Sequence, residues 1–292
     1  MKPIRPRRSA LYVPGSNPRA MAKAPMLGAD VVIFDLEDAV APSAKEESRA
    51  RVAEGVAALR SGDGTASEIV VRVNGLDTPW IEADLAVIGA TRPDGILLPK
   101  ISRARDLARV RAMIAPDIAF PLWAMIETPR AVLDPIGIAE AQDERLPLVA
   151  LVLGLNDLAR ETGTRQIPGR APMLPWMMTA LAAARAAGLD ILDGVFNDIA
   201  DADGFAAECR QGRDCGFDGK TVIHPKQIEG ANAAFAPDAA ELAWAARIAG
   251  VFDEPDNAGK GVVSVDGRMV ERLHAEMAGR LLALAKAIAA RG

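Results

Sequence analysis

The sequence is poor in cysteine and has no long apolar run. It holds two cysteines, Cys209 and Cys215, in 292 residues, which excludes a disulfide-rich fold and is typical of reduced thiols in the cytoplasm. No apolar run approaches about 18 residues, the length that a membrane-spanning helix needs. The first eight residues are basic but lack the apolar stretch of a signal peptide. We therefore expect a cytoplasmic protein with no membrane partner.

Basic residues are also fewer than acidic ones. The sequence has 34 Lys and Arg residues against 39 Asp and Glu residues, which gives a formal net charge of −5 at pH 7 and a pI of about 5.3. No segment gathers basic residues into a stripe, so the sequence argues against a nucleic acid as partner. Because 50% of the residues are apolar, the chain can bury a large core.

Short apolar runs alternate with segments of helical spacing as far as residue 223. The runs are continuously apolar, as in parallel strands that are covered on both faces. Eight such units suit a (β/α)8 TIM barrel, an α/β fold that typically takes about 250 residues. An open doubly wound sheet is the alternative, but no Gly-x-Gly-x-x-Gly fingerprint follows any of the runs. The expected strands are residues 9–13, 31–36, 68–73, 95–99, 119–126, 148–154, 191–196 and 220–223.

The character of the sequence changes after residue 235. We expect a barrel catalytic domain at 1–235 and a C-terminal helical extension and lid at 236–292. The extension reads as a helix over 238–252, a polar linker, an extended segment at 262–265 and a final helix from about Met269. Barrel enzymes often close their mouths with such segments, which keeps water away from the chemistry.

Charged and amide side chains stand just past several of the apolar runs. In parallel α/β folds, ligands bind at the carboxyl ends of the strands. Several acids and one arginine at such a rim indicate a hard metal ion that holds an anionic substrate, and hence an enzyme. The residues are Asp35, Glu37, Asp38, Arg72, Asn74, Lys100, Glu127, Asn156 and Asp157.

Six short strings give the sequence a family resemblance. They are residues 8–15 (RSALYVPG), 34–40 (FDLEDAV), 71–77 (VRVNGLD), 98–100 (LPK), 126–129 (IETP) and 216–220 (GFDGK). In this order they resemble the citrate lyase β-subunit-like proteins of the HpcH/HpaI aldolase superfamily. The resemblance implies a modified barrel, Mg²⁺ dependence, a coenzyme A (CoA) thioester as ligand, and a homotrimer or hexamer.

The resemblance also assigns roles to residues at the rim. Glu127 and Asp157 match the family's magnesium ligands, and the alternative is that either one caps the following helix. Arg72 matches the family's substrate arginine, whose planar fork can grip a carboxylate or an enolate oxygen. The alternative for Arg72 is a structural pair with Asp35 or Glu37.

The remaining rim residues have less certain assignments. Asp35, Glu37 and Asp38 cannot all bind a metal that already has two acids. We expect one of them to fix Arg72, and we expect Glu37 and Asp38 to line the cavity as catalytic candidates. Lys100 would neutralise a substrate oxygen or organise the acids. Asn74 and Asn156 are further candidates for substrate binding.

CoA needs cations for its phosphates, and this part of the prediction rests on the resemblance alone. The candidates for binding the CoA part of the thioester lie around the first expected strand and are Arg8, Arg19 and Tyr12. The alternative for Arg8 and Arg19 is that they belong to an ordinary solvated basic surface and bind no ligand.

The final segment departs from the family pattern. The family usually has Gly-Lys-Met-Val-Asp-x-Pro, with an aspartate that reaches a neighbouring subunit's site as acid/base. Here residues 267–273 read GRMVERL, so Glu271 takes the place of the aspartate and the proline is absent. Glu271 is either the acid/base or an ordinary acid on a helix surface.

The resemblance therefore predicts a Mg²⁺-dependent carbon–carbon lyase. It would cleave or form a 3-hydroxyacyl-CoA, such as malyl-, methylmalyl- or citramalyl-CoA, giving an acyl-CoA and a 2-oxo acid. One alternative is an aldolase for free pyruvate, which would need an early histidine base. The sequence has only His224 and His274, which counts against it. Another is a non-catalytic or carrier-dependent citrate lyase β-type subunit that binds an acyl-carrier protein.

Overall fold

The computed structural model describes residues 4–61 and 67–291 of the protein. The chain divides into two compact units. One is Arg7–Phe235, and the other consists mainly of the residues from Ala236 onward. Each unit has its own apolar core.

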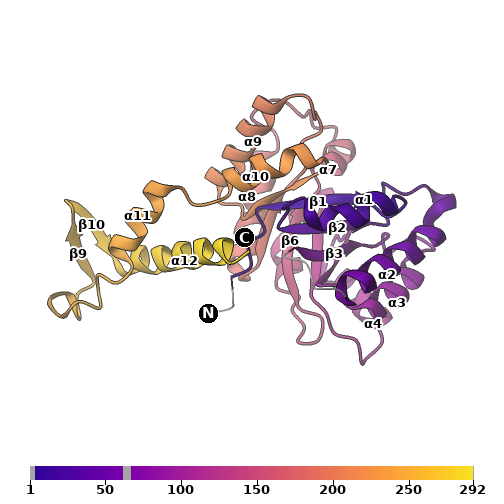
Figure 1. The fold of residues 1–292 in the computed structure, drawn as a ribbon, viewed down its shortest axis with the longest axis horizontal. Helices are drawn as coiled ribbons and strands as arrows, with labels where there is room; N and C mark the ends of the chain where they lie inside the picture. The colour runs from indigo at the N-terminus through magenta and orange to yellow at the C-terminus, as the bar shows by residue number, and fades with distance from the viewer. Residues whose placement is uncertain (1–3, 62–66, 292) are drawn as a thin grey trace. The chain divides into compact units, whose positions relative to one another are not determined.

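The larger unit is a closed barrel of eight parallel strands (Figure 1). The strands follow each other in chain order, and the eighth pairs with the first through Ser9↔Lys220. The predicted (β/α)8 barrel is confirmed. Its strands are β1 Ser9–Pro14, β2 Val31–Asp35, β3 Glu68–Arg72, β4 Gly95–Leu98, β5 Leu122–Ile126, β6 Leu148–Leu153, β7 Asp190–Asp193 and β8 Gly219–Val222.

Helices connect the strands and cover the outside of the barrel (Figure 1). The longer ones are α2 Lys45–Ser61, α3 Ile81–Thr91, α4 Ala104–Met113, α7 Leu155–Thr162, α8 Leu174–Ala186, α9 Ala202–Cys215 and α10 Ile228–Ala234. The shorter ones are α1 Pro18–Lys23, α5 Pro129–Leu133 and α6 Pro135–Ala139, with 3-10 turns η1 Ala24–Met26, η2 Pro42–Ala44 and η3 Pro225–Gln227.

Two expected strands differ from the structure by three residues at one end. β5 begins at Leu122 rather than at residue 119, after Pro121, whose nitrogen has no hydrogen to give to a ladder. β7 ends at Asp193 rather than at residue 196. The Gly194 N–H donates to the Asp193 carboxylate at 2.8 Å, so it is not offered to a neighbouring strand.

Strand side chains alternate between the barrel interior and the helix layer. Ile33, Val70 and Met125 belong to the interior cluster, whereas Val32 and Val71 belong to the large outer cluster against the helices. Because both faces are buried, the strands read as continuous apolar runs.

The amino-terminal end of the barrel is closed by an ionic group. Arg7 donates to both oxygens of Glu68 at 2.8 Å and to Asp190 at 2.5 Å. Its guanidinium lies over the Trp123 ring, 4.6 Å from the centroid. The opposite end, where the strands deliver their polar carboxyl-terminal residues, is termed the open end.

The smaller unit contains α11 Ala239–Ile248, η4 Pro255–Asn257, β9 Val262–Val265, β10 Arg268–Glu271 and α12 Arg272–Ala289. The prediction of a helix from Met269 is wrong at its start, because residues 268–271 form a strand antiparallel to β9. Asp266 and Gly267 have φ values of 50° and 77°. Two successive left-handed residues make the tight turn that favours a hairpin.

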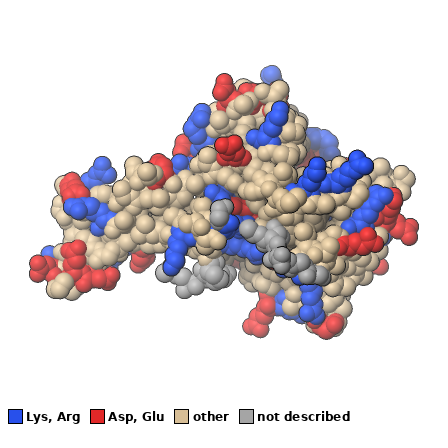
Figure 2. All heavy atoms as spheres, in the orientation of Figure 1, with Lys and Arg blue, Asp and Glu red and all other residues tan. Residues whose placement is uncertain are grey.

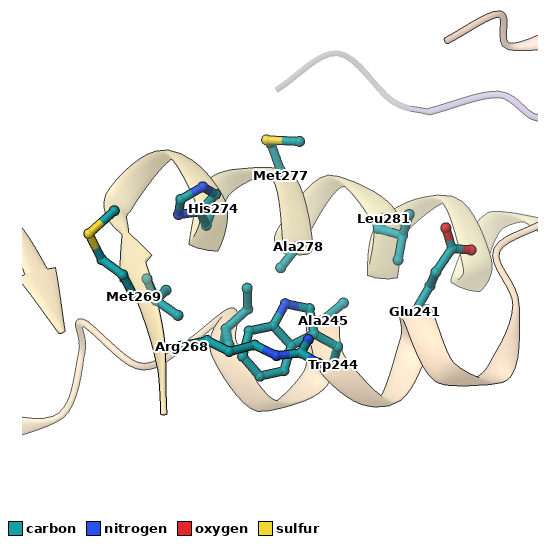
Figure 3. A pocket seen from close by; sticks show the side chains of 11 residues that line it. Glu241, Trp244, Ala245, Arg268, Met269, His274, Met277, Ala278 and Leu281 are labelled. Carbon is teal, nitrogen blue, oxygen red and sulfur yellow. The ribbon is translucent and has the colours of Figure 1, made fainter. Parts of the chain in front are cut away.

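An apolar pocket of about 410 Å³ lies within this smaller unit (Figure 3). The Arg268 guanidinium stacks on Trp244, 5.0 Å from the ring centroid. Met269 and Met277 line the pocket and are 67% and 65% exposed. Exposed apolar patches of this kind are typical of surfaces that contact other proteins.

None of the described helices combines the length and the apolar character that crossing a membrane requires. On the face drawn in Figure 2, basic side chains are interspersed with acidic ones. This matches the near balance of the two signs in the sequence.

Candidate active site

The acids and the arginine predicted to share a rim do lie together. Asp35 and Arg72 are the last residues of β2 and β3, and they are partners in the register of the two strands. Glu127 follows β5 directly, and Asp157 lies in the first turn of α7. Lys100, two residues past β4, contacts both of these acids.

Asp35 is the acid that fixes Arg72. Arg72 Nε and Nη2 donate to the two Asp35 oxygens at 2.7 and 2.6 Å. The same oxygens accept the backbone N–H groups of Glu37 and Ala39. Burial would raise the pKa of Asp35, but Arg72 outweighs it and holds that pKa below its usual value. The question of which acid fixes Arg72 is thereby answered.

The remaining nitrogen of Arg72 faces the other polar groups of the cluster. Nη1 lies 2.8 Å from Glu37 Oε2, and the guanidinium lies over the Tyr12 ring at 4.8 Å. Tyr12 donates weakly to Met125 Sδ at 3.9 Å, and burial raises the pKa of its hydroxyl. Arg72 is therefore rigid, with one edge locked by Asp35 and with its Nη1 in an ion pair with Glu37.

Glu37 and Asp38 differ in their surroundings. The Glu37 side chain is 10% exposed, and burial raises its pKa to about 7 although Arg72 opposes the rise. Asp38 is 64% exposed and comes no closer to Arg72 than 3.9 Å. Of the two acids predicted to line the cavity, Glu37 is buried within the cluster and Asp38 is exposed.

Sequence reasoning missed the residue that supports this loop. Lys45 is buried and donates to the carbonyl oxygens of Leu36 and Glu37, both at 2.7 Å. It stands in the first turn of α2, where the helix dipole disfavours a cation. A lysine in the first turn of a helix was therefore the feature of the sequence that could have identified this residue.

Glu127 is fully buried and is not a helix cap. The cap of α5 is Thr128, whose hydroxyl accepts the Ala131 N–H. Glu127 Oε1 accepts the backbone N–H of Lys100 at 2.6 Å. Its Oε2 has no hydrogen-bond donor within the described residues, and burial raises its pKa.

Gly154 makes room for this carboxylate. A Cβ at position 154 would stand 2.4 Å from both Cβ and Oε2 of Glu127, a distance that only glycine avoids. Gly154 is also the N-cap residue of α7, directly before Leu155, so it lies on the path that leads to Asp157.

Asp157 also lacks the contacts of a helix cap. Its Oδ1 lies 2.6 Å from Lys100 Nζ and 2.6 Å from Arg160 Nη2. Neither approach has hydrogen-bond angles, and Oδ1 has no donor within the described part of the chain. Asp157 therefore faces cations without being bonded as a capping carboxylate is.

These two acids fit a hard divalent cation. In the described ranges, no group of three or more His, Cys, Asp and Glu side chains forms a complete metal cage. Mg²⁺, however, usually takes one or two protein carboxylates and fills its octahedron with water and substrate. The buried, donor-free oxygens Glu127 Oε2 and Asp157 Oδ1 are the kind of ligand atom that such an ion needs.

The two predicted substrate amides are engaged elsewhere. Asn74 Nδ2 donates to Asp84 of α3 at 2.6 Å, and its backbone N–H donates to the same oxygen. The Asn74 amide nitrogen thus anchors α3, and a role for Asn74 in substrate binding stays a prediction. Asn156 exchanges hydrogen bonds with Asn197 at 3.0 and 2.8 Å and stays exposed beside Asp157.

The prediction for Arg8 is wrong. Arg8 precedes β1, at the end of the barrel opposite to the acids, and pairs with both oxygens of Asp30 at 2.8 and 2.9 Å. It cannot reach a ligand at the open end. Arg19 lies exposed on α1, which follows β1 at that open end, and stays a candidate.

Glu271 belongs to the smaller unit. It ends β10 and precedes α12, and its backbone N–H donates to His274 Nδ1 at 2.9 Å. Its role as acid/base at the barrel stays a prediction.

A buried ionic network on the outer face of the barrel was also missed. The Asp193 carboxylate accepts from Arg170 Nη1 at 2.7 Å and from Lys220 at 3.0 Å. Lys220, fully buried, also donates to Glu208 of α9 at 2.6 Å. The network ties β7, β8, α9 and the loop before α8 together. A lysine inside an expected strand was the signal in the sequence.

We expect Asp193→Asn to destabilise the fold by about 3–5 kcal/mol, because it leaves buried cations without their partner. Burial would raise the pKa of Asp193, but Lys220 and Arg170 outweigh it and lower that pKa. The carboxylate therefore stabilises the fold above its unfolded pKa of about 3.9, and this contribution is lost as pH falls through the lower folded value.

Urea unfolding at neutral pH and below pH ~4 tests this prediction. The difference in the free energy of unfolding between variant and wild type should be smaller in acid. Exposed Asp203→Asn, also on α9, is the control. An equal gap at both pH values contradicts the account.

The sequence profile of the HpcH/HpaI aldolase/citrate lyase family matches residues 8–225. A (3S)-malyl-CoA thioesterase of Cereibacter sphaeroides is 48% identical over 285 residues, covering 98% of this chain and 96% of the relative. The citrate lyase subunit beta of Leuconostoc mesenteroides is 35% identical over 289 residues, covering 96% and 94%.

A solved structure agrees over nearly the whole chain. CitE from Mycobacterium tuberculosis, in complex with magnesium, acetoacetate and coenzyme A, has a TM-score of 0.76 and 30% identity, and the match covers 95% of this chain and 97% of that one. A citrate lyase beta subunit from the same organism, with oxaloacetate and magnesium, has a TM-score of 0.68 and covers 80% and 98%. The chain therefore belongs to the HpcH/HpaI aldolase/citrate lyase family.

Proposed function

We propose that this protein is a Mg²⁺-dependent carbon–carbon lyase acting on a 3-hydroxyacyl-CoA such as malyl-, methylmalyl- or citramalyl-CoA. The observation that carries the proposal is the pair of carboxylates Glu127 and Asp157, each with a buried oxygen that has no hydrogen-bond donor within the described residues. They lie in one cluster with Arg72, which Asp35 locks on one edge and whose Nη1 faces Glu37. The magnesium, acetoacetate and CoA bound by the related CitE support the same reading.

Glu127 and Asp157 would hold the ion, which when bound supplies a Lewis acid for the substrate's oxygens. Arg72, locked by Asp35, presents Nη1 to a substrate carboxylate or to the thioester oxygen. A base removes the 3-hydroxyl proton and the C2–C3 bond breaks. Its electron pair passes to the thioester carbonyl, which gives an enolate and a 2-oxo acid. Arg72 is placed to stabilise that charge, and an acid then protonates C2.

We assign that proton transfer to Glu271. Glu271→Gln should keep CoA-ester binding but lower kcat by about 10²–10⁴-fold, the usual scale for a general acid or base. Glu271→Asp shortens the arm by one methylene and should restore part of the rate. Steady-state kinetics measures the fall in kcat, and a binding titration with the CoA ester measures its affinity. Exposed Glu276→Gln on α12 is the control. Wild-type turnover by the Gln variant would move the role to Glu37.

Thioester hydrolysis is the second candidate. It is favoured by the relatives named (3S)-malyl-CoA thioesterase, which are 46–48% identical over 98% of this chain. The same cluster could bind the ester while water attacks the thioester carbonyl, so that CoA leaves with its sulfur and malate is released.

One assay separates the candidates. The protein is incubated with the three CoA esters, with the same acids as esters of an acyl-carrier protein, and with free 4-hydroxy-2-oxo acids, each with Mg²⁺ or with EDTA. Both 2-oxo acid and free thiol are followed. A lyase releases 2-oxo acid without free thiol, and a thioesterase releases thiol without 2-oxo acid. Turnover only of an ester on an acyl-carrier protein would indicate the citrate lyase β-type subunit. Turnover of free 4-hydroxy-2-oxo acids alone would indicate the aldolase.

We also propose a homotrimer or hexamer in the cytoplasm, with Arg19 and Tyr12 near the bound CoA. The exposed Met269 and Met277 support an assembly surface. Light scattering on the eluted protein measures the mass of the assembly.

A further inference from the structure

One cation stands in the space between the two proposed metal ligands. Lys100 Nζ lies 2.6 Å from Asp157 Oδ1 and 3.6 Å from Glu127 Oε1. It also lies 3.9 Å from Glu37 Oε1. Three carboxylates thus converge on a single ammonium. This is the arrangement that a metal ion would have among the same groups.

The backbone of Lys100 is held separately from its side chain. Lys100 has a φ of 55°, the left-handed region that residues with a Cβ seldom adopt. In this conformation its N–H donates to Glu127 Oε1 at 2.6 Å. The amide can therefore orient Glu127 whether or not the ammonium is present.

The ammonium neutralises the acids without satisfying them. Lys100 Nζ, Asp157 Oδ1 and Glu127 Oε2 all lack a hydrogen bond within the described residues, despite the short distances. The Lys100 side chain is 29% exposed and its stem is flexible, so it can turn toward solvent. Arg72, in contrast, is locked by two parallel bonds to Asp35.

A divalent ion and this ammonium cannot share the space. Mg²⁺ sits about 2.0–2.1 Å from its ligand oxygens, and Lys100 Nζ already lies within 2.6 Å of one of them. We infer that Lys100 is a displaceable counter-ion, whose ammonium neutralises Glu127 and Asp157 in the metal-free protein and leaves when the divalent cation binds. This inference rests on the metal site of the proposed function.

Mg²⁺ binding and thermal unfolding test this inference without reference to turnover. Lys100→Met keeps the backbone amide and a long stem but removes the charge. The variant should bind Mg²⁺ about tenfold more tightly in calorimetric titration, because no ammonium competes. Without metal its Tm should be lower than that of wild type, and the rise in Tm on adding Mg²⁺ should be larger. Arg160→Met is the matched control.

Arg160 also lies 2.6 Å from Asp157 Oδ1, but it is 68% exposed, and Glu161 is its other neighbouring acid. Its removal should change the Mg²⁺ affinity by less than about twofold, as expected for a solvent-exposed pair. Equal or weaker Mg²⁺ binding by Lys100→Met, while wild type binds and Glu127→Gln does not, would overturn the counter-ion role alone. Absence of Mg²⁺ binding by wild type would overturn both this role and the proposed metal site.

Discussion

Glu127→Gln should abolish Mg²⁺-dependent turnover while leaving the barrel folded. Glu127 is one of only two proposed protein ligands, and losing one removes several kcal/mol of charge stabilisation in the transition state. The rate should therefore fall by about 10³-fold or more. The metal-free variant should be at least as stable as wild type, because the substitution removes a buried carboxylate with a donor-free oxygen.

Turnover at saturating Mg²⁺ and thermal unfolding in EDTA measure the two effects. Glu140→Gln, an exposed acid next to α6, is the matched control and should change neither. Full activity of Glu127→Gln in saturating Mg²⁺ would overturn the assignment of the metal ligand.

Arg72→Lys should be nearly as damaging as Arg72→Ala. Arg72 bonds both oxygens of Asp35 and keeps Nη1 for Glu37 or a ligand. A lysine has one nitrogen for all of these partners and loses the planar fork. If Arg72 stabilises the enolate, kcat and kcat/KM should fall together, whereas a change in KM alone indicates uniform substrate binding.

The control is Arg49→Lys, which alters another Arg–Asp pair that is partly buried and lies outside the cluster. Arg49 Nε donates to Asp84 at 2.7 Å, and its replacement should leave kcat unchanged. A kcat for Arg72→Lys close to that of wild type contradicts the role given to the guanidinium fork.

Sequence reasoning placed the rim residues on the right strands but could not assign their partners. The family resemblance singled out Glu127 and Asp157 for the metal site, and the cost of an unpaired acid after a buried strand supported that choice. The partner of Asn74 is Asp84, and the partner of Arg8 is Asp30. The spacing of residues along the chain does not predict either pair, because each pair depends on how neighbouring elements pack.

The choice among Asp35, Glu37 and Asp38 also needed the structure. The backbone turns outward after β2, because Asp35 accepts the N–H groups of Glu37 and Ala39 and Lys45 holds the following carbonyls. That turn encloses Glu37 and exposes Asp38. Three adjacent acids of similar chemistry cannot be told apart by residue type.

The sequence by itself determined the barrel, because strands buried on both faces must be continuously apolar and recur with helices between them. It also determined which strand ends carry charge. Only the tertiary structure decided that Asp35 locks Arg72, that Gly154 admits the Glu127 carboxylate, and that Lys100 occupies the space between two acids. These are contacts between residues far apart in the chain, and they exist only once the strands have closed and fixed the distances between their ends.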